Sequence, residues 1–165
     1  MAGERGILAR RRIEAEIIKP IYAILRRDYG EDRAKEIVAE AITEAAREAG
    51  RRAAAELAPA AADLASFVEL LPLWLKGGAL EIEIRRREAG RFEYDVKRCR
   101  YAEMYRDLGL GDDLGVLLSC NRDAAFIEGY APEVEFRRTG TIMEGARICD
   151  FRYRAPGGKP KDPEG

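Results

Sequence analysis

The chain of 165 residues contains no histidine and no glutamine, and Asn121 is its only asparagine. The absence of histidine excludes a Ser-His-Asp triad, a Cys-His dyad and every histidine-ligated metal site. Any acid–base chemistry in this chain must therefore come from Asp, Glu, Cys, Tyr or Lys side chains.

Cysteine is scarce, with only Cys99, Cys120 and Cys149 in the chain. An odd number without a C-x-x-C pair does not resemble a disulfide scaffold, so we expect reduced thiols and a cytoplasmic protein. Three thiolates and a carboxylate can also bind zinc, and a thiolate metal-binding protein stays open as a third function. Because the cysteines fall on three separate predicted elements, we expect no metal and no other cofactor.

The sequence also lacks a charge excess and a long apolar run. Its 29 basic and 30 acidic residues give a net charge of −1, which provides no bulk attraction for nucleic acid or an anionic membrane. The apolar run from Ala65 to Leu75 is interrupted by Glu69 and Pro72 and is shorter than the roughly 20 residues of a membrane span. The first ten residues have no apolar segment typical of a signal peptide. We therefore expect neither a nucleic-acid nor a membrane partner.

Apolar residues at helical spacing fill the first half of the chain. The isoleucines between Ile13 and Ile24 predict a first helix, with a kink or break at Pro20. Gly30 ends this pattern, and a second helix is expected from about Glu31 to Ala58. A third helix is expected from Pro59 to the Gly77-Gly78 pair.

After residue 78 the apolar period changes from 3.6 to two. This alternation predicts a hairpin with its turn at 88–90, helices broken at 109–111, and a second hairpin with strands at about 134–142 and 147–154. Together these elements predict a single α+β domain over residues 1–154, in which an N-terminal helical layer packs on a mostly antiparallel sheet of about four strands. The helical part spans 1–78, the hairpin-helices-hairpin part spans 79–154, and residues 155–165 are expected to form a disordered tail. The apolar helical layer is compatible with a homodimer.

Cys120 and Asp123 form the first candidate pair, because three residues separate side chains on one face of a helix. A carboxylate raises the pKa of a neighbouring thiol, so an active Cys120 needs Arg122, Arg152 or a helix N-terminus close by. The alternatives are a buried, inert Cys120 and an Asp123 that caps a helix or pairs with an arginine.

The predicted second hairpin carries the other candidates. If Glu144-Gly145 is a two-residue turn, Thr141 faces Ile148, Thr139 faces Asp150 and Arg137 faces Arg152. Thr139, Thr141, Asp150 and Arg152 then share one face of the sheet, and Cys149 points to the other face. Asp150 and Arg152 can equally be a cross-strand ion pair, and Cys149 can be a core residue.

Taken in order, these residues resemble a known family. The series runs through Cys99-Arg-Tyr101, Leu108-Gly109, Ser119-Cys-Asn-Arg-Asp-Ala-Ala-Phe126, Thr139-Gly-Thr-Ile142 and Gly145-Ala-Arg-Ile-Cys-Asp-Phe-Arg-Tyr153. It resembles the L-2-amino-thiazoline-4-carboxylic acid hydrolase family over roughly residues 70–154, and the leading helices resemble it only in general character.

The resemblance implies a hydrolase that opens a small cyclic amidine or amide to an N-carbamoyl amino acid. In this chain Cys120 could attack the ring carbon, or Asp123 could activate water, with Asp150 as a further catalytic candidate. Substrate binding would fall to Arg152 for the carboxylate, to Thr139 and Thr141 for the amidine or the tetrahedral centre, and to Cys149. The alternative function is a non-catalytic domain that binds a small molecule or an acyl ligand, with Phe67, Trp74 and Phe126 along its pocket.

Overall fold

The computed structural model describes residues 6–58 and 61–157. It begins with a hairpin of two long helices, α1 (Ile7–Tyr29) and α2 (Glu31–Ala55). Gly30 joins them with a φ of 85°, a left-handed value that glycine adopts without steric cost. α1 continues through Pro20 as one helix, so the break considered there does not occur.

The next helix, α3 (Leu64–Leu75), begins at a capping box. Asp63 accepts a hydrogen bond from the Ser66 amide at 2.8 Å, and Ser66 Oγ accepts one from the Asp63 amide at 2.9 Å. These two bonds satisfy amides that a helix start otherwise leaves unpaired. The predicted start at Pro59 lies outside the described residues, and the predicted end is correct: α3 passes into a 3₁₀ turn, η1 (Lys76–Gly78).

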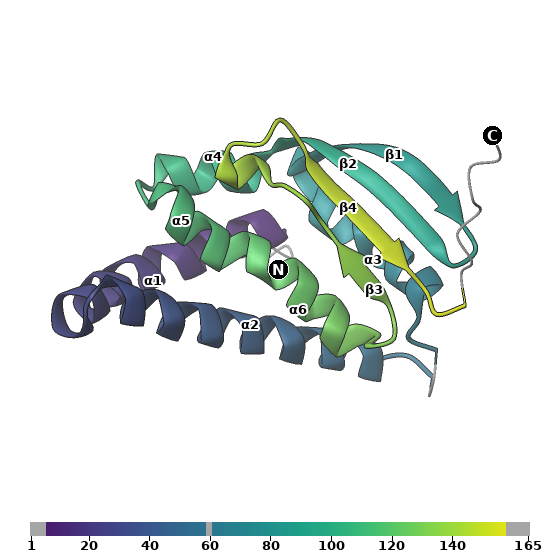
Figure 1. Ribbon diagram of the computed structural model, residues 1–165, viewed down its shortest axis with the longest axis horizontal. Helices are drawn as coiled ribbons and strands as arrows, with labels where there is room; N and C mark the ends of the chain where they lie inside the picture. The colour runs from purple at the N-terminus through teal and green to yellow at the C-terminus, as the bar shows by residue number, and fades with distance from the viewer. Residues whose placement is uncertain (1–5, 59–60, 158–165) are drawn as a thin grey trace, which may run out of the picture.

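The sheet contains β1 (Leu80–Glu88), β2 (Arg91–Cys99), β3 (Glu135–Arg137) and β4 (Cys149–Arg154). Its strands are antiparallel neighbours in the order β1-β2-β4-β3. The predicted α+β fold is therefore confirmed, with helices dominating the first half and a four-stranded antiparallel sheet in the second (Figure 1).

A helical segment connects β2 to β3. It consists of α4 (Arg100–Asp107), α5 (Gly111–Gly115), a π-helical turn η2 (Val116–Cys120) and α6 (Asn121–Tyr130). The predicted break at 109–111 is confirmed, since Gly109 and Gly111 both adopt positive φ there. α5, η2 and α6 follow one another without a break and lie between the α1–α2 hairpin and the sheet (Figure 1).

The second hairpin differs from its prediction. β3 ends at Arg137, and a loop with a 3₁₀ turn, η3 (Ile142–Glu144), replaces the two-residue turn. Side chains satisfy the loop backbone: Thr141 Oγ1 accepts from the Glu144 amide at 3.1 Å, and Asp150 accepts from the amides of Thr139 and Gly140. These bonds replace a strand ladder, because Ser, Thr and Asp side chains compete with regular pairing. The predicted alignment of Arg137 with Arg152 is correct, and that of Thr141 with Ile148 is wrong.

The two faces of the sheet differ in character. Inward side chains of β2 and β4 alternate with polar ones and are nearly inaccessible, at 2% for Phe92 and 3% for Tyr153. They pack against α3 and α6 in one core, while α1, α2, α4, α5 and η2 form a second core. The outer face carries charged residues. Among them is Asp95, which forms ion pairs with Arg85 and Arg152 and is only 2% exposed. Among the helices of residues 6–58 and 61–157, none has the length and apolar character needed to cross a membrane.

α2 and α6 approach each other backbone to backbone. A Cβ placed on Gly50 would lie 2.2 Å from the Phe126 carbonyl oxygen, and one on Gly129 would lie 2.0 Å from the Arg47 carbonyl oxygen. Real Cβ atoms do not approach backbone so closely, and neither helix can move without disturbing its own core. Only glycine at both positions therefore allows α6 to lie at this distance from α2.

We expect Gly129→Ala to lower the free energy of unfolding by about 3 kcal/mol, the upper end for an overpacked core. At roughly 2–4 °C per kcal/mol, the midpoint of thermal unfolding should fall by about 6–12 °C. The matched control is Gly6→Ala, because Gly6 has a φ of −55° and open space around its Cβ position. Calorimetry that finds equal midpoints for Gly129→Ala and the control would show that the two helices are not in obligatory contact.

Candidate functional site

Arg138 and Asp123 form an ion pair where the two cores meet. Arg138 follows β3, and its Nη1 contacts Asp123 Oδ2 on α6 while its Nη2 donates to the Cys120 carbonyl oxygen at 3.0 Å. The side chains retain 14% and 29% exposure. Burial raises the pKa of the Asp123 carboxyl above its usual value, and the Arg138 guanidinium opposes this shift.

Aromatic rings surround this ion pair. The Arg138 guanidinium carbon lies 5.2 Å from the centroid of Phe151 and 5.6 Å from that of Phe136, within the range of cation–π attraction. Tyr94 stacks on Phe151 with centroids 4.8 Å apart and on Tyr153 with centroids 6.4 Å apart. Burial raises the pKa of both tyrosines, so both phenols remain protonated.

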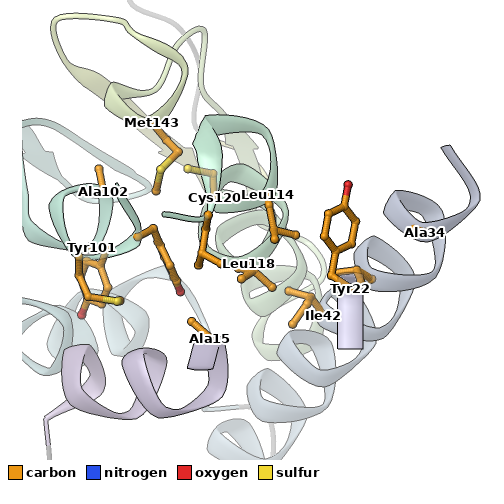
Figure 2. Close-up of a cluster of buried hydrophobic side chains, with 14 of the residues drawn as sticks. Ala15, Tyr22, Ala34, Ile42, Tyr101, Ala102, Leu114, Leu118, Cys120 and Met143 are labelled. Atoms are coloured by element: carbon orange, nitrogen blue, oxygen red, sulfur yellow. The ribbon is translucent and has the colours of Figure 1, made fainter. Parts of the chain in front are cut away.

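Cys120 is the last residue of the π-helical turn and is 9% exposed. Figure 2 shows its side chain inside the helical core, on the side of Met143. Burial raises the pKa of its thiol to about 12, the Asp123 carboxylate adds to the shift, and Arg138 opposes it. The nearby Thr141 hydroxyl also opposes the rise in the pKa of this thiol. Cys120 is therefore a neutral thiol at physiological pH.

The other two cysteines lie nearby and are also free thiols. Cys149 Sγ accepts a hydrogen bond from the Ile142 amide at 3.1 Å, and burial raises the pKa of this thiol. Burial raises the pKa of Cys99 to about 11. Cys149 is close enough to add to the pKa shifts of both Cys99 and Cys120, so the structure brings the three cysteines into one region.

None of the activating groups considered for Cys120 serves that purpose. α6 continues directly from η2, and Cys120 has helical angles of φ −64° and ψ −32°, so no free helix N-terminus faces its thiol. Arg122 donates to Glu14 at 2.8 Å and to the Leu118 carbonyl at 2.7 Å. Arg152 pairs with Asp95 at 2.7 Å on the outer face of the sheet.

Arg138 is the cation that the sequence reasoning missed. It directly precedes the Thr139-Gly-Thr141 motif, and that position was the signal available for it. Strand alternation places Arg138 on the same side as Phe136 and opposite Arg137, and α6 covers that side of the sheet.

The remaining candidates are divided between the two sides of the sheet. Thr141 and Cys149 lie near Cys120, whereas Thr139, Asp150 and Arg152 belong to the outer side. Burial tends to raise the pKa of Asp150, but hydrogen bonds from Thr139 and Gly140 lower it below its usual value. Asp150 thus holds the loop after β3 in place, and Cys149 and Asp150 point to opposite faces, as strand geometry predicts.

The described residues contain no group of three or more His, Cys, Asp or Glu side chains arranged to hold a metal ion.

A surface hollow of about 290 Å³ lies between the first turns of α3 and the β1–β2 turn, lined in part by Leu64, Val68 and Phe92. The residues around Cys120 do not line it. The candidate site is thus the set formed by Cys120, Asp123, Arg138, Thr141, Cys149, Tyr94 and Tyr153.

Comparison with known families gives a match for L-2-amino-thiazoline-4-carboxylic acid hydrolase over residues 10–153. The chain belongs to this family. The match includes the two long helices as well as the motif-bearing second half, so it extends beyond the region in which the sequence motifs indicated the resemblance.

A solved structure also has this fold. The chain is similar to the phenol-responsive sensory domain of the transcription activator PoxR, solved with phenol, at a TM-score of 0.51 and 12% identity. The similarity covers 92% of this chain and 77% of that one. No curated protein matches the chain.

The raised thiol pKa values predict how this member of the hydrolase family reacts with alkylating agents. With a pKa of about 12, about one Cys120 thiol in 10,000 is ionised at pH 8, whereas a free cysteine with a pKa of about 8.5 is ionised to about a quarter. We expect iodoacetamide labelling of Cys120, followed by mass spectrometry, to keep accelerating with pH up to at least pH 10. A labelling rate that reaches a plateau near pH 7 would show an activated thiolate instead.

Proposed function

We propose that this chain binds a small planar molecule at the Asp123–Arg138 ion pair, between the inner face of the sheet and α6. The observation that carries the proposal is the placement of this charged pair among aromatic rings. A half-buried ion pair contributes little to stability, because desolvation offsets the attraction between the charges. It is well suited to recognition, because a polar ligand group can exchange hydrogen bonds with it.

The side chains present favour a flat ligand with one or two polar groups. The rings of Tyr94, Phe136 and Phe151 offer faces for stacking, and Arg138 can hold a carboxylate or a hydroxyl. The hydroxyls of Tyr94 and Tyr153 add further hydrogen-bonding groups. Phenol is a flat ring with one hydroxyl, and 2-amino-thiazoline-4-carboxylate is a small ring with a planar amidine portion and one carboxylate.

The comparisons support the same conclusion. The family name denotes a substrate that is a small ring with a carboxylate, and the PoxR sensory domain was solved with phenol. In both cases the named molecule is a small ring that carries at least one polar group. Because side chains fill the interior, we expect the ligand to enter by displacing some of them, which couples binding to a change in packing.

We expect Arg138→Met to weaken binding of phenol and of 2-amino-thiazoline-4-carboxylate at least tenfold, because the variant keeps the chain length and loses the charge. The measurement is the ligand-induced rise in unfolding temperature, supported by titration calorimetry. A ligand at 100 times its Kd stabilises the folded state by about 2.7 kcal/mol.

Arg137→Met is the matched control, since Arg137 is the preceding residue, its side chain is 76% exposed and it aligns with Arg152 on the outer face. This variant should bind as the natural chain does. If neither compound stabilises the protein, or if both variants bind equally well, the ion pair is not the binding site.

Hydrolysis of such a ligand is the second candidate function, and the family match favours it. In this reaction water adds to the ring carbon between nitrogen and sulfur, the carbon–sulfur bond breaks, and the sulfur leaves as a thiol to give an N-carbamoyl amino acid. Asp123 is the better candidate for activating that water, because the Cys120 thiol is protonated.

The two mechanisms differ in the variants they predict. If Asp123 activates water, Asp123→Asn abolishes turnover and Cys120→Ala retains most of it. If Cys120 attacks the ring, Cys120→Ala abolishes turnover. We expect the first pattern when 2-amino-thiazoline-4-carboxylate is incubated with each variant and the product is followed by mass spectrometry; loss of activity only in Cys120→Ala would reject it.

A further inference from the structure

α1 carries a stripe of exposed isoleucines on the side that faces away from the cores. Ile13, Ile17, Ile21 and Ile24 are 42%, 59%, 47% and 50% exposed. Their spacings of four, four and three residues place them on one face of the helix. The buried residues of α1 are Ala15 and Tyr22, so the isoleucine stripe contributes nothing to the core of its own chain.

Exposed isoleucines in such a continuous row mark a surface that another molecule covers. Single exposed apolar residues are ordinary, but four on one helix face form a contiguous strip along about half of the length of α1. Beyond each end of the isoleucine stripe, the same face of α1 carries a charged residue, and the two charges are of opposite sign. Arg10 lies one turn before Ile13, Asp28 lies one turn after Ile24, and both are exposed.

We propose that the isoleucine stripe is a dimer interface, in which α1 packs antiparallel against α1 of a second copy of this chain. Antiparallel pairing about a two-fold axis places Ile17 opposite Ile21 and Ile13 opposite Ile24. The same pairing places Arg10 opposite Asp28 at both ends of the interface, which makes the face complementary to itself. A parallel pair would bring Arg10 against Arg10 and Asp28 against Asp28.

The length of α1 sets the expected strength of this dimer. Its 23 residues span about 35 Å at 1.5 Å per residue. One helix pair of this length lies at the small end of specific interfaces, below about 1,200 Å² in total. We therefore expect dissociation in the micromolar range. In the single chain Asp28 pairs with Arg27, but the Arg27 and Asp28 side chains are 71% and 41% exposed, so solvent weakens this contact.

The test is sedimentation velocity on the full chain from about 1 to 200 µM, a range that brackets the dissociation constant of a small interface. The natural chain should shift from monomer to dimer, and the double variant Ile17→Lys with Ile21→Lys should stay monomeric. The control is Ile84→Lys, because Ile84 is a comparably exposed isoleucine at 48%, on β1. It should dimerise like the natural chain, and circular dichroism of all variants shows that they remain folded.

A charge exchange tests the antiparallel arrangement separately. Arg10→Asp alone and Asp28→Arg alone should each weaken the dimer, since each places like charges at both ends of the interface. The double exchange Arg10→Asp with Asp28→Arg should restore it. A chain that is monomeric throughout the range, a dimer that the lysines leave intact, or a double exchange without rescue would overturn the proposal, as would isoleucine-dependent binding to lipid vesicles by a monomer.

Discussion

The crossing of α2 and α6 is the constraint on which the rest of this structure depends. Gly50 and Gly129 let the two backbones touch, and no other residue fits at either position. This contact fixes α6 at a set distance from the α1–α2 hairpin, and α6 in turn covers the inner face of the sheet. Asp123, on α6, therefore lies between the two cores and next to the loop that follows β3.

The chemistry of the site follows from that convergence. Burial keeps the thiols of Cys99 and Cys120 protonated, and the charged groups Asp123 and Arg138 are paired with each other. An environment of this kind recognises a polar group within an apolar interior better than it activates a sulfur nucleophile. Membership of the L-2-amino-thiazoline-4-carboxylic acid hydrolase family is compatible with the proposed small-molecule ligand at this position.

Local patterns predicted most of the fold. Apolar spacing identified α1, α2 and the β1–β2 hairpin, and the glycines at 77–78 and 109–111 correctly identified the end of α3 and the break between α4 and α5. The two-residue turn predicted for the second hairpin was wrong because Thr141 and Asp150 bind the loop backbone, and residue spacing does not show that competition. Residue spacing also could not predict the full candidate site. Cys120 and Asp123 are neighbours in the chain, whereas Arg138 reaches them from the end of β3, 15 residues beyond Asp123.

A structure of the chain with bound ligand tests the central claim most directly. Crystals grown with 2-amino-thiazoline-4-carboxylate or with phenol should show the molecule within about 3.2 Å of an Asp123 or Arg138 side-chain atom, the usual limit of a hydrogen bond. Its ring should contact Tyr94, Phe136 or Phe151. A ligand bound instead in the hollow between α3 and the β1–β2 turn, with the Asp123–Arg138 pair unchanged, would contradict the claim.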